Sequence, residues 1–166
     1  MSPERAESDL DGVINSLRRI TQALRLSSSV VQTKLGITGA QLFVLQQLAD
    51  NPVSSLRELQ TRTFTDQSSV SVVVSRLVAA GHVTRKRSKT DARRIELTLT
   101  PTGRALLRKA PELAQTKLVE QLRAAGAKDL KTTATVLERV ARAVAPDDEP
   151  AMFFEPPANA KKSRRA

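Results

Sequence analysis

Two short alternating segments joined by a turn constrain the fold of this chain more than any other feature. Apolar and polar residues alternate over residues 82–87 and again over residues 95–99, with the turn over residues 88–92. Such alternation is typical of half-buried strands and predicts an antiparallel hairpin. A two-stranded sheet is only marginally stable by itself, so we expect this hairpin to pack against helices.

A helix is predicted directly before the hairpin, between Asp66 and Gly81. An acidic residue favours the positive N-terminal end of a helix, and glycine is a common C-terminal stop. Valine is a poor helix former, so tertiary packing must hold the apolar face, which contains Val70, Val73, Val74 and Leu77. The polar side chains of this helix are Gln67, Ser68, Ser69, Ser71, Ser75 and Arg76.

Three further helices are predicted upstream. Apolar residues at helical spacing indicate a long amphipathic helix over residues 10–35. Thr38 can cap a second helix over residues 39–49, and Ser55 with Glu58 forms the capping box of a short third helix. The second helix is expected to bury Leu42, Leu45, Leu48 and Ala49.

Downstream of the hairpin, Thr100 and Pro101 predict the start of a fifth helix, which Pro111 should kink or briefly break before about residue 124. A sixth helix is expected to end near Val144. The chain then divides into an N-terminal arm (1–9), a domain (10–145) and a tail (146–166) whose composition predicts disorder. The predicted fold is mainly α, with six helices and a small two-stranded β wing, a winged helix-turn-helix.

Charge and composition narrow the possible partners. The formal net charge is +10, and residues 54–100 hold nine basic against four acidic residues. Six of those cations lie within residues 85–94, where Asp91 alone opposes them. This concentration predicts an element that faces phosphate. The absence of Trp and Tyr argues against single-stranded nucleic acid, which aromatic side chains usually stack on.

Several other functions are disfavoured. Cysteine is absent, which excludes disulfides, thiolate nucleophiles and cysteine zinc sites. The sequence contains no motif that pairs a nucleophile with a general base, no phosphate-binding loop and no cluster of metal ligands. We therefore expect neither enzymatic activity nor a bound cofactor or metal. No segment resembles a signal peptide or a membrane span, and we expect a cytoplasmic protein without a membrane partner.

The hairpin and its surroundings resemble the MarR family of winged-helix regulators over roughly residues 10–145. The motif Asp91-Ala92-Arg93 matches the family's Asp-x-Arg signature, and Leu99-Thr100 then leads into Pro101-Thr102-Gly103. Arg76-Leu77 and the segment 81–85 resemble the end of the family's recognition helix. The sequence departs from the family at Phe64, in a turn that commonly contains glycine, and at His82, which replaces leucine.

The resemblance implies a bacterial, nucleoid-associated transcriptional regulator. It implies a homodimer formed by residues 10–35 and 101–145, with residues 38–100 binding a double-stranded DNA operator. It also implies a repressor that a small phenolic or anionic effector relieves. Two alternatives remain open, which are a ligand-independent architectural DNA-binding protein and a protein-interaction adaptor that uses the winged helix.

Two groups of residues are candidates for DNA contact. The polar side chains between Gln67 and Ser75 would face base edges in the major groove, with Arg76 better suited to phosphate. By resemblance, Arg93 enters the minor groove, and Asp91 would orient Arg93 or Arg94 through a charge-assisted hydrogen bond. The candidates of the wing are Arg85, Arg87, Lys89, Asp91, Arg93 and Arg94.

Weaker candidates lie outside these segments. Ser27 and Ser28 could line a ligand pocket, although such serines more often serve helix packing. His82 is the only histidine and is expected at a strand edge rather than at a metal. The apolar segment 152–154 could contact the dimer or a partner, but an unstructured tail is the simpler expectation.

Overall fold

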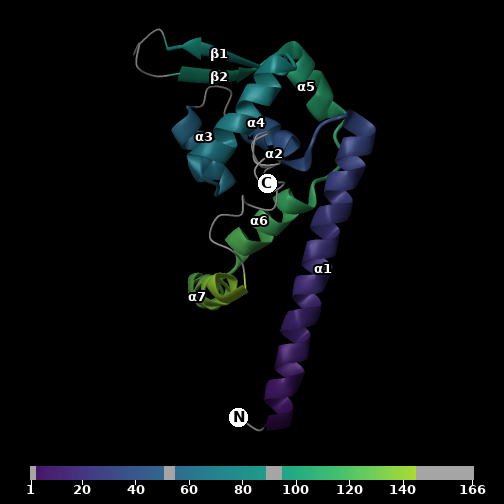
Figure 1. Cartoon of the computed structure of the whole chain (residues 1–166), viewed down its shortest axis with the longest axis vertical. Helices are drawn as coiled ribbons and strands as arrows, with labels where there is room; N and C mark the ends of the chain where they lie inside the picture. The colour runs from purple at the N-terminus through teal and green to yellow at the C-terminus, as the bar shows by residue number, and fades with distance from the viewer. Residues whose placement is uncertain (1–2, 51–54, 89–94, 145–166) are drawn as a thin grey trace, which may run out of the picture.

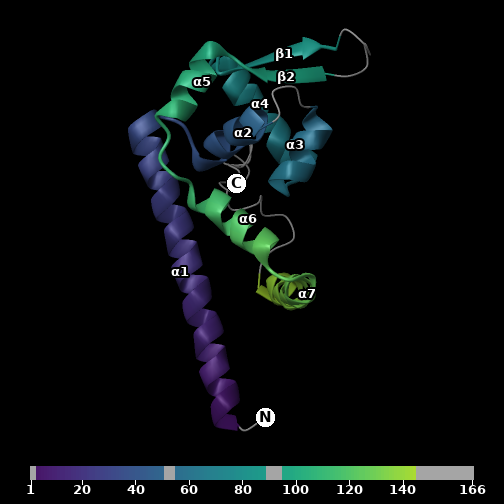
Figure 2. The ribbon, with the colours of Figure 1, turned by 180° about the vertical axis from the view of Figure 1, so that it is seen from behind.

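The computed structural model describes residues 3–50, 55–88 and 95–144, which form seven helices and one two-stranded sheet. Figure 1 shows a compact group of elements around α2, with the hairpin projecting from one end and α1 extending away at the other. The N-terminus therefore lies far from the hairpin, as the reverse view in Figure 2 also shows. None of the described helices is long and apolar enough to span a bilayer.

Helix α1 (Pro3–Leu35) begins seven residues before the predicted start, so residues 3–9 belong to the helix and are not a separate arm. The apolar pattern missed this segment because Ala6 is the one apolar side chain among residues 4–9, which is too few to mark a helical face. Pro3 and Glu4 nevertheless suit it, since proline lacks an N–H that would stay unbonded there and an acidic residue favours the helix dipole.

Helix α2 (Gly39–Asp50) forms the centre of the fold. Its predicted cap is confirmed, since the Thr38 hydroxyl accepts the Gln41 N–H at 3.2 Å and the Gln41 side chain accepts the Thr38 N–H at 2.8 Å. Helices α1, α3, α4 and α5 and strand β2 all contact α2. Leu42, Leu45 and Leu48 are buried as predicted, together with Phe43 and Val44, whereas Ala49 is exposed.

Helices α3 (Leu56–Thr63) and α4 (Gln67–Ala79) form the helix-turn-helix. The capping box of α3 is present, with the Ser55 N–H donating to Glu58 at 3.0 Å and the Glu58 N–H donating to Ser55 at 3.2 Å. The predicted apolar face of α4 is confirmed, because Val70, Val73, Val74 and Leu77 are all buried. Their burial compensates for the low helix propensity of valine.

Strands β1 (Val83–Arg87) and β2 (Ile95–Leu99) form the predicted antiparallel hairpin, or wing. Val83 pairs with Leu99, and both are buried in the core with Leu97. The base of the wing is therefore fixed by hydrophobic packing, as a two-stranded sheet requires.

Helices α5 (Pro101–Arg108), α6 (Ala114–Ala124) and α7 (Ala127–Val144) complete the described chain. The predicted interruption at Pro111 is a complete break, so two helices stand where one kinked helix was expected. Proline cannot donate the backbone hydrogen bond and disfavours helical geometry at the preceding residue. The described chain therefore contains seven helices rather than six.

Candidate nucleic-acid interface

Asp66 organises the start of α4. Its carboxylate accepts a hydrogen bond from the Ser68 hydroxyl and another from the Ser69 N–H at 2.9 Å. These hydrogen bonds lower the pKa of Asp66 from 3.8 to about 2, because they stabilise the charged form. Asp66 is thus a helix cap at neutral pH, and its carboxylate is hydrogen-bonded to donors of its own helix.

The polar residues of α4 divide between two sides of the helix. At 100° per residue, Gln67, Ser68, Ser71 and Ser75 fall within one sector, and Ser69 and Arg76 fall on another. Gln67, Ser68 and Ser75 are exposed, whereas Ser69, Ser71 and Arg76 are half-buried. The Ser75 hydroxyl donates to the Ser71 carbonyl at 2.8 Å. The first sector is a polar surface of short side chains.

The wing adds positive charge next to α4, which strand β1 contacts. Arg85 pairs with Leu97 and Arg87 pairs with Ile95, and both arginines are exposed. Since side chains alternate along a strand, both lie on the same hairpin face as buried Val83. The other predicted wing residues lie outside the described residues: Lys89, Asp91, Arg93 and Arg94.

The end of α4, the wing and α5 are locked together by a clamp that consists of Thr100, Thr102 and Gly103. The Thr100 and Thr102 hydroxyls donate to the Gly81 carbonyl at 2.8 Å and 2.9 Å. The Thr100 N–H donates to the His82 carbonyl at 3.1 Å. The clamp holds the wing at a fixed position relative to α4.

Glycine is required in this clamp. A Cβ atom at Gly103 would lie 2.2 Å from the His82 carbonyl oxygen, which is far too close. The Gly103 N–H also donates to the Thr100 hydroxyl at 3.0 Å, which caps α5. Sequence reasoning identified Thr100 as a cap but missed its hydrogen bond to Gly81, although Thr-Pro-Thr-Gly directly after a strand was the available signal.

His82 lies between α4 and β1, one residue before the strand that was expected to include it. It is half-buried, and its Nδ1 atom is buried without a hydrogen-bond partner within the described part of the chain. Within the same part, no group of three or more His, Cys, Asp or Glu residues could hold a metal ion.

Ser27 and Ser28 connect α1 with its neighbours. The Ser27 hydroxyl accepts the Ala114 N–H at 3.0 Å at the start of α6. Ser28 packs so closely on Gly39 that a Cβ there would lie 2.6 Å from the Ser28 hydroxyl oxygen. Both serines therefore have packing roles in this structure.

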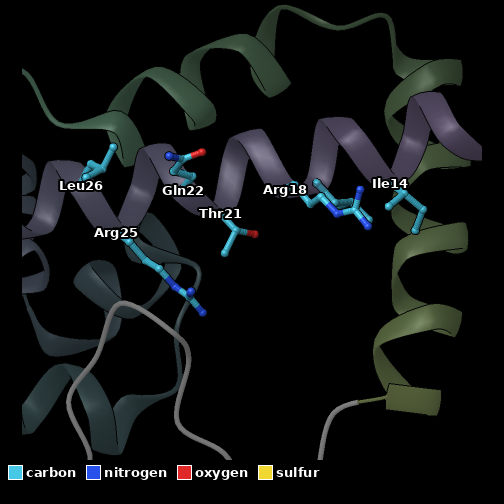
Figure 3. Close-up of a pocket in the computed structure, with 7 residues that line it drawn as sticks. Ile14, Arg18, Thr21, Gln22, Arg25 and Leu26 are labelled. Carbon is cyan, nitrogen blue, oxygen red and sulfur yellow. The ribbon is translucent and has the colours of Figure 1, made fainter.

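A hollow of about 640 Å³ lies further toward the N-terminal end of α1 (Figure 3). Its described lining includes two arginines, Arg18 and Arg25, beside apolar and amide side chains. The remaining lining residues are Ile14, Leu17, Thr21, Gln22 and Leu26. The hollow does not include the serine pair proposed from the sequence.

Known transcriptional regulators are similar to this chain. The MarR family model matches residues 35–94. The transcriptional regulator TtmR of Methylorubrum extorquens is 36% identical over 70 residues, which cover 42% of this chain but only 36% of TtmR. The transcriptional repressor Mb2911 of Mycobacterium bovis is 32% identical over 94 residues, which cover 57% of this chain and 68% of that repressor.

The fold agrees with a solved structure. BpsR of Bordetella bronchiseptica, whose DNA binding is described as regulated by 6-hydroxynicotinic acid, aligns with a TM-score of 0.51 and 26% identity. The alignment covers 78% of this chain and 98% of BpsR. Together with the helix-turn-helix and its clamped wing, these matches show that the chain belongs to the MarR family of winged-helix transcriptional regulators.

Proposed function

We propose that this protein binds operator DNA as a homodimer and represses transcription until a small ligand releases it. The observation that carries the proposal is the contact of α4, which has an exposed polar side, with strand β1, which has two exposed arginines. One rigid unit can then present a groove-reading helix and a phosphate-binding strand to the same duplex.

Helix α4 is suited to the major groove. An α-helix fits that groove, and serine and glutamine side chains can bond to the edges of the bases. Gln67, Ser68, Ser71 and Ser75 share one side of α4, so we assign base contact to this sector. Arg76 lies on the adjoining side, together with Ser69, and is assigned to the phosphate backbone.

The wing is suited to backbone contact. Arg85 and Arg87 lie two residues apart on one strand face, and arginine pairs well with phosphate oxygens. Arg93, with Asp91, Lys89 and Arg94, continues this basic element in the sequence, and its insertion into the minor groove remains a prediction.

The proposed dimer explains the exposed apolar residues of α1 and α7. Leu17 and Ile20 are 37% and 39% exposed, and Leu137 and Val140 are 42% and 44% exposed. Helix α7 contains no buried residue although its apolar side chains share a face. A second copy of the chain would remove these faces from water and would place two α4 helices on one duplex.

Regulation by a ligand is supported by the likeness to BpsR. We propose that the effector acts where α1 meets α2 and α6, by displacing the packing contacts that Ser27 and Ser28 make in this structure. The proposed effector is a phenolic or anionic small molecule, which the hydroxyl groups at this junction could orient.

The experiment that tests this function is selection of duplex sequences by the purified protein. The expected product is a pseudo-palindrome with half-sites about 10 base pairs apart, or a multiple of that spacing. Weak preference against competitor DNA would favour an architectural protein, and no duplex binding at low salt would favour an adaptor. In vitro transcription from the selected operator, with and without phenolic acids, then tests repression and release.

A further inference from the structure

Phe64 is an unusual residue for its position, in the turn between α3 and α4. Its φ of 54° lies in the left-handed region. Among the described residues, Phe64 is the only one other than glycine that has a positive φ. Glycine adopts this conformation without the steric cost that a Cβ imposes. Burial does not explain the phenylalanine, because its side chain is 68% exposed.

The ring of Phe64 has a partner in a distant helix. The Arg123 guanidinium lies over the ring, 5.8 Å from its centroid, which is within the range of a cation–π interaction. Arg123 belongs to the last turn of α6. The interaction therefore joins the end of α6 to the turn that positions the recognition helix.

The described hydrogen bonds that join α6 to α1 and α2 lie near the N-terminal end of α6, opposite to Arg123. The Ala114 N–H donates to Ser27 at 3.0 Å, and the Thr116 hydroxyl donates to the Gln46 side chain at 2.7 Å. From residue 120 to residue 144 every described side chain is exposed. Since Arg123 lies seven residues beyond Thr116, about 10 Å along the helix, its interaction with Phe64 restrains the far end of α6.

Helix α7 continues from this far end after a short connection, and Figures 1 and 2 show it on the side of α6 away from the wing. Without the restraint at Arg123, α6 could tilt about its attached N-terminal end, and α7 would move with it. The tilt would change the angle between α7 and the recognition helix α4.

We propose that the Arg123–Phe64 interaction sets this angle and thereby sets the half-site spacing that the dimer accepts on DNA. The inference rests on the proposed function, in which α1 and α7 form the dimer. In a two-fold dimer, a tilt of α6 and α7 shifts both α4 helices relative to the axis. A shift of about 3.4 Å along the duplex corresponds to one base pair. Arg123 and Phe64 are thus positioning residues that need not touch DNA.

The test compares the wild-type dimer with Arg123→Ala, Phe64→Leu and the double variant. Affinities are measured for the selected operator, for operators with one base pair added or removed between half-sites, and for a single half-site duplex. Arg108→Ala, which removes an exposed arginine on α5, is the control for loss of charge.

The wild type should bind the selected spacing more tightly than the altered spacings. In each variant, the affinity for the selected spacing divided by the affinity for an altered spacing should fall about two- to fivefold for every cation–π interaction removed. Each subunit of the dimer has one such interaction, so a variant dimer loses two. The double variant should match the single variants, and half-site affinity, dimer dissociation and thermal unfolding should match Arg108→Ala. An unchanged spacing profile in Arg123→Ala would overturn the proposal, whereas absence of duplex binding by the wild type would refute the proposed function itself.

Discussion

At the scale of single residues, a few side chains connect local structure with the proposed DNA-binding surface. Asp66 caps the recognition helix with a carboxylate that stays ionised, and Gly103 lets α5 approach the turn that follows the same helix. Neither residue needs to contact DNA to affect binding, because each one fixes an end of the recognition helix.

Replacing Asp66 with alanine should lower the free energy of unfolding by about 1 kcal/mol at pH 7, the usual cost of losing a helix cap. The folded pKa of about 2 lies below the ordinary value of 3.8, so this carboxylate contributes stability above pH 3.8. That contribution is lost as the pH falls through about 2. Urea unfolding at pH 7 and at pH 2 measures both effects.

Asp66→Asn is the matched control, because asparagine caps helices about as well but does not titrate there. It should retain most of the stability at pH 7 and lose less than the wild type on acidification. Equal acid sensitivity in the wild type and in Asp66→Asn would show that other carboxylates dominate this pH range.

Gly103→Ala should destabilise the protein by roughly 1–3 kcal/mol, because the new methyl group would collide with the His82 carbonyl. The clamp would have to open, so DNA affinity should fall as well. Gly12→Ala is the control, since nothing lies within 4 Å of a Cβ at that helical position and alanine should add roughly 0.5–1 kcal/mol. Thermal unfolding of both variants shows whether each substitution raises or lowers the stability of the protein. Stabilisation by both substitutions would argue against the clamp.

At the scale of elements, the wing and the recognition helix have different proposed contributions to affinity. Contacts with phosphate depend on salt because they release counterions, whereas base contacts give sequence preference. The arginines of β1 should therefore dominate the salt dependence, and the polar sector of α4 should dominate the choice of operator.

Arg85→Ala combined with Arg87→Ala should weaken binding to all duplexes. The slope of log affinity against log salt should decrease by about 0.9 for each phosphate that the protein no longer neutralises. Arg139→Ala removes an exposed arginine on α7 and should leave the slope unchanged, because Figure 1 shows helix α7 far from the wing. If the control and the wing variant show the same slope, the wing strand does not contact phosphate.

At the scale of the whole molecule, the described chain combines a packed DNA-binding group around α2 with two helices whose apolar faces have no partner. Helix α1 has apolar residues that remain exposed near its N-terminal end, and α7 is exposed along its full length. Such faces are costly in water, which makes self-association the expected behaviour of this protein.

Leu137→Glu should weaken the dimer at least tenfold, or about 1.4 kcal/mol, because a charge would be buried without a partner. Thr135→Glu is the control, since it adds the same charge on the opposite side of α7. Sedimentation velocity over a range of concentrations gives both dissociation constants. Equal effects of the two substitutions would show that this face of α7 is not the interface.

The agreement between sequence and structure is closest where the determining interactions are short in sequence. The caps at Thr38, Ser55 and Asp66 involve residues three positions apart, and all three are present. The break at Pro111 was likewise visible in the sequence, although not its extent. The proposed DNA contacts of Gln67, Ser71 and their neighbours remain predictions, since α4 shows which side is polar but not which base it meets.

The sequence by itself determined the hairpin and most of the helices, because caps, apolar spacing and turn residues act within a few positions of each other, and its motifs carried the family resemblance. Only the tertiary structure showed how these elements are joined. The Thr100 hydroxyl reaches Gly81 across 19 positions, and the Ala114 N–H reaches Ser27 across 87. No local pattern encodes such pairs, because they form only when packing brings distant segments together. The interaction between Phe64 and Arg123 arises in the same way.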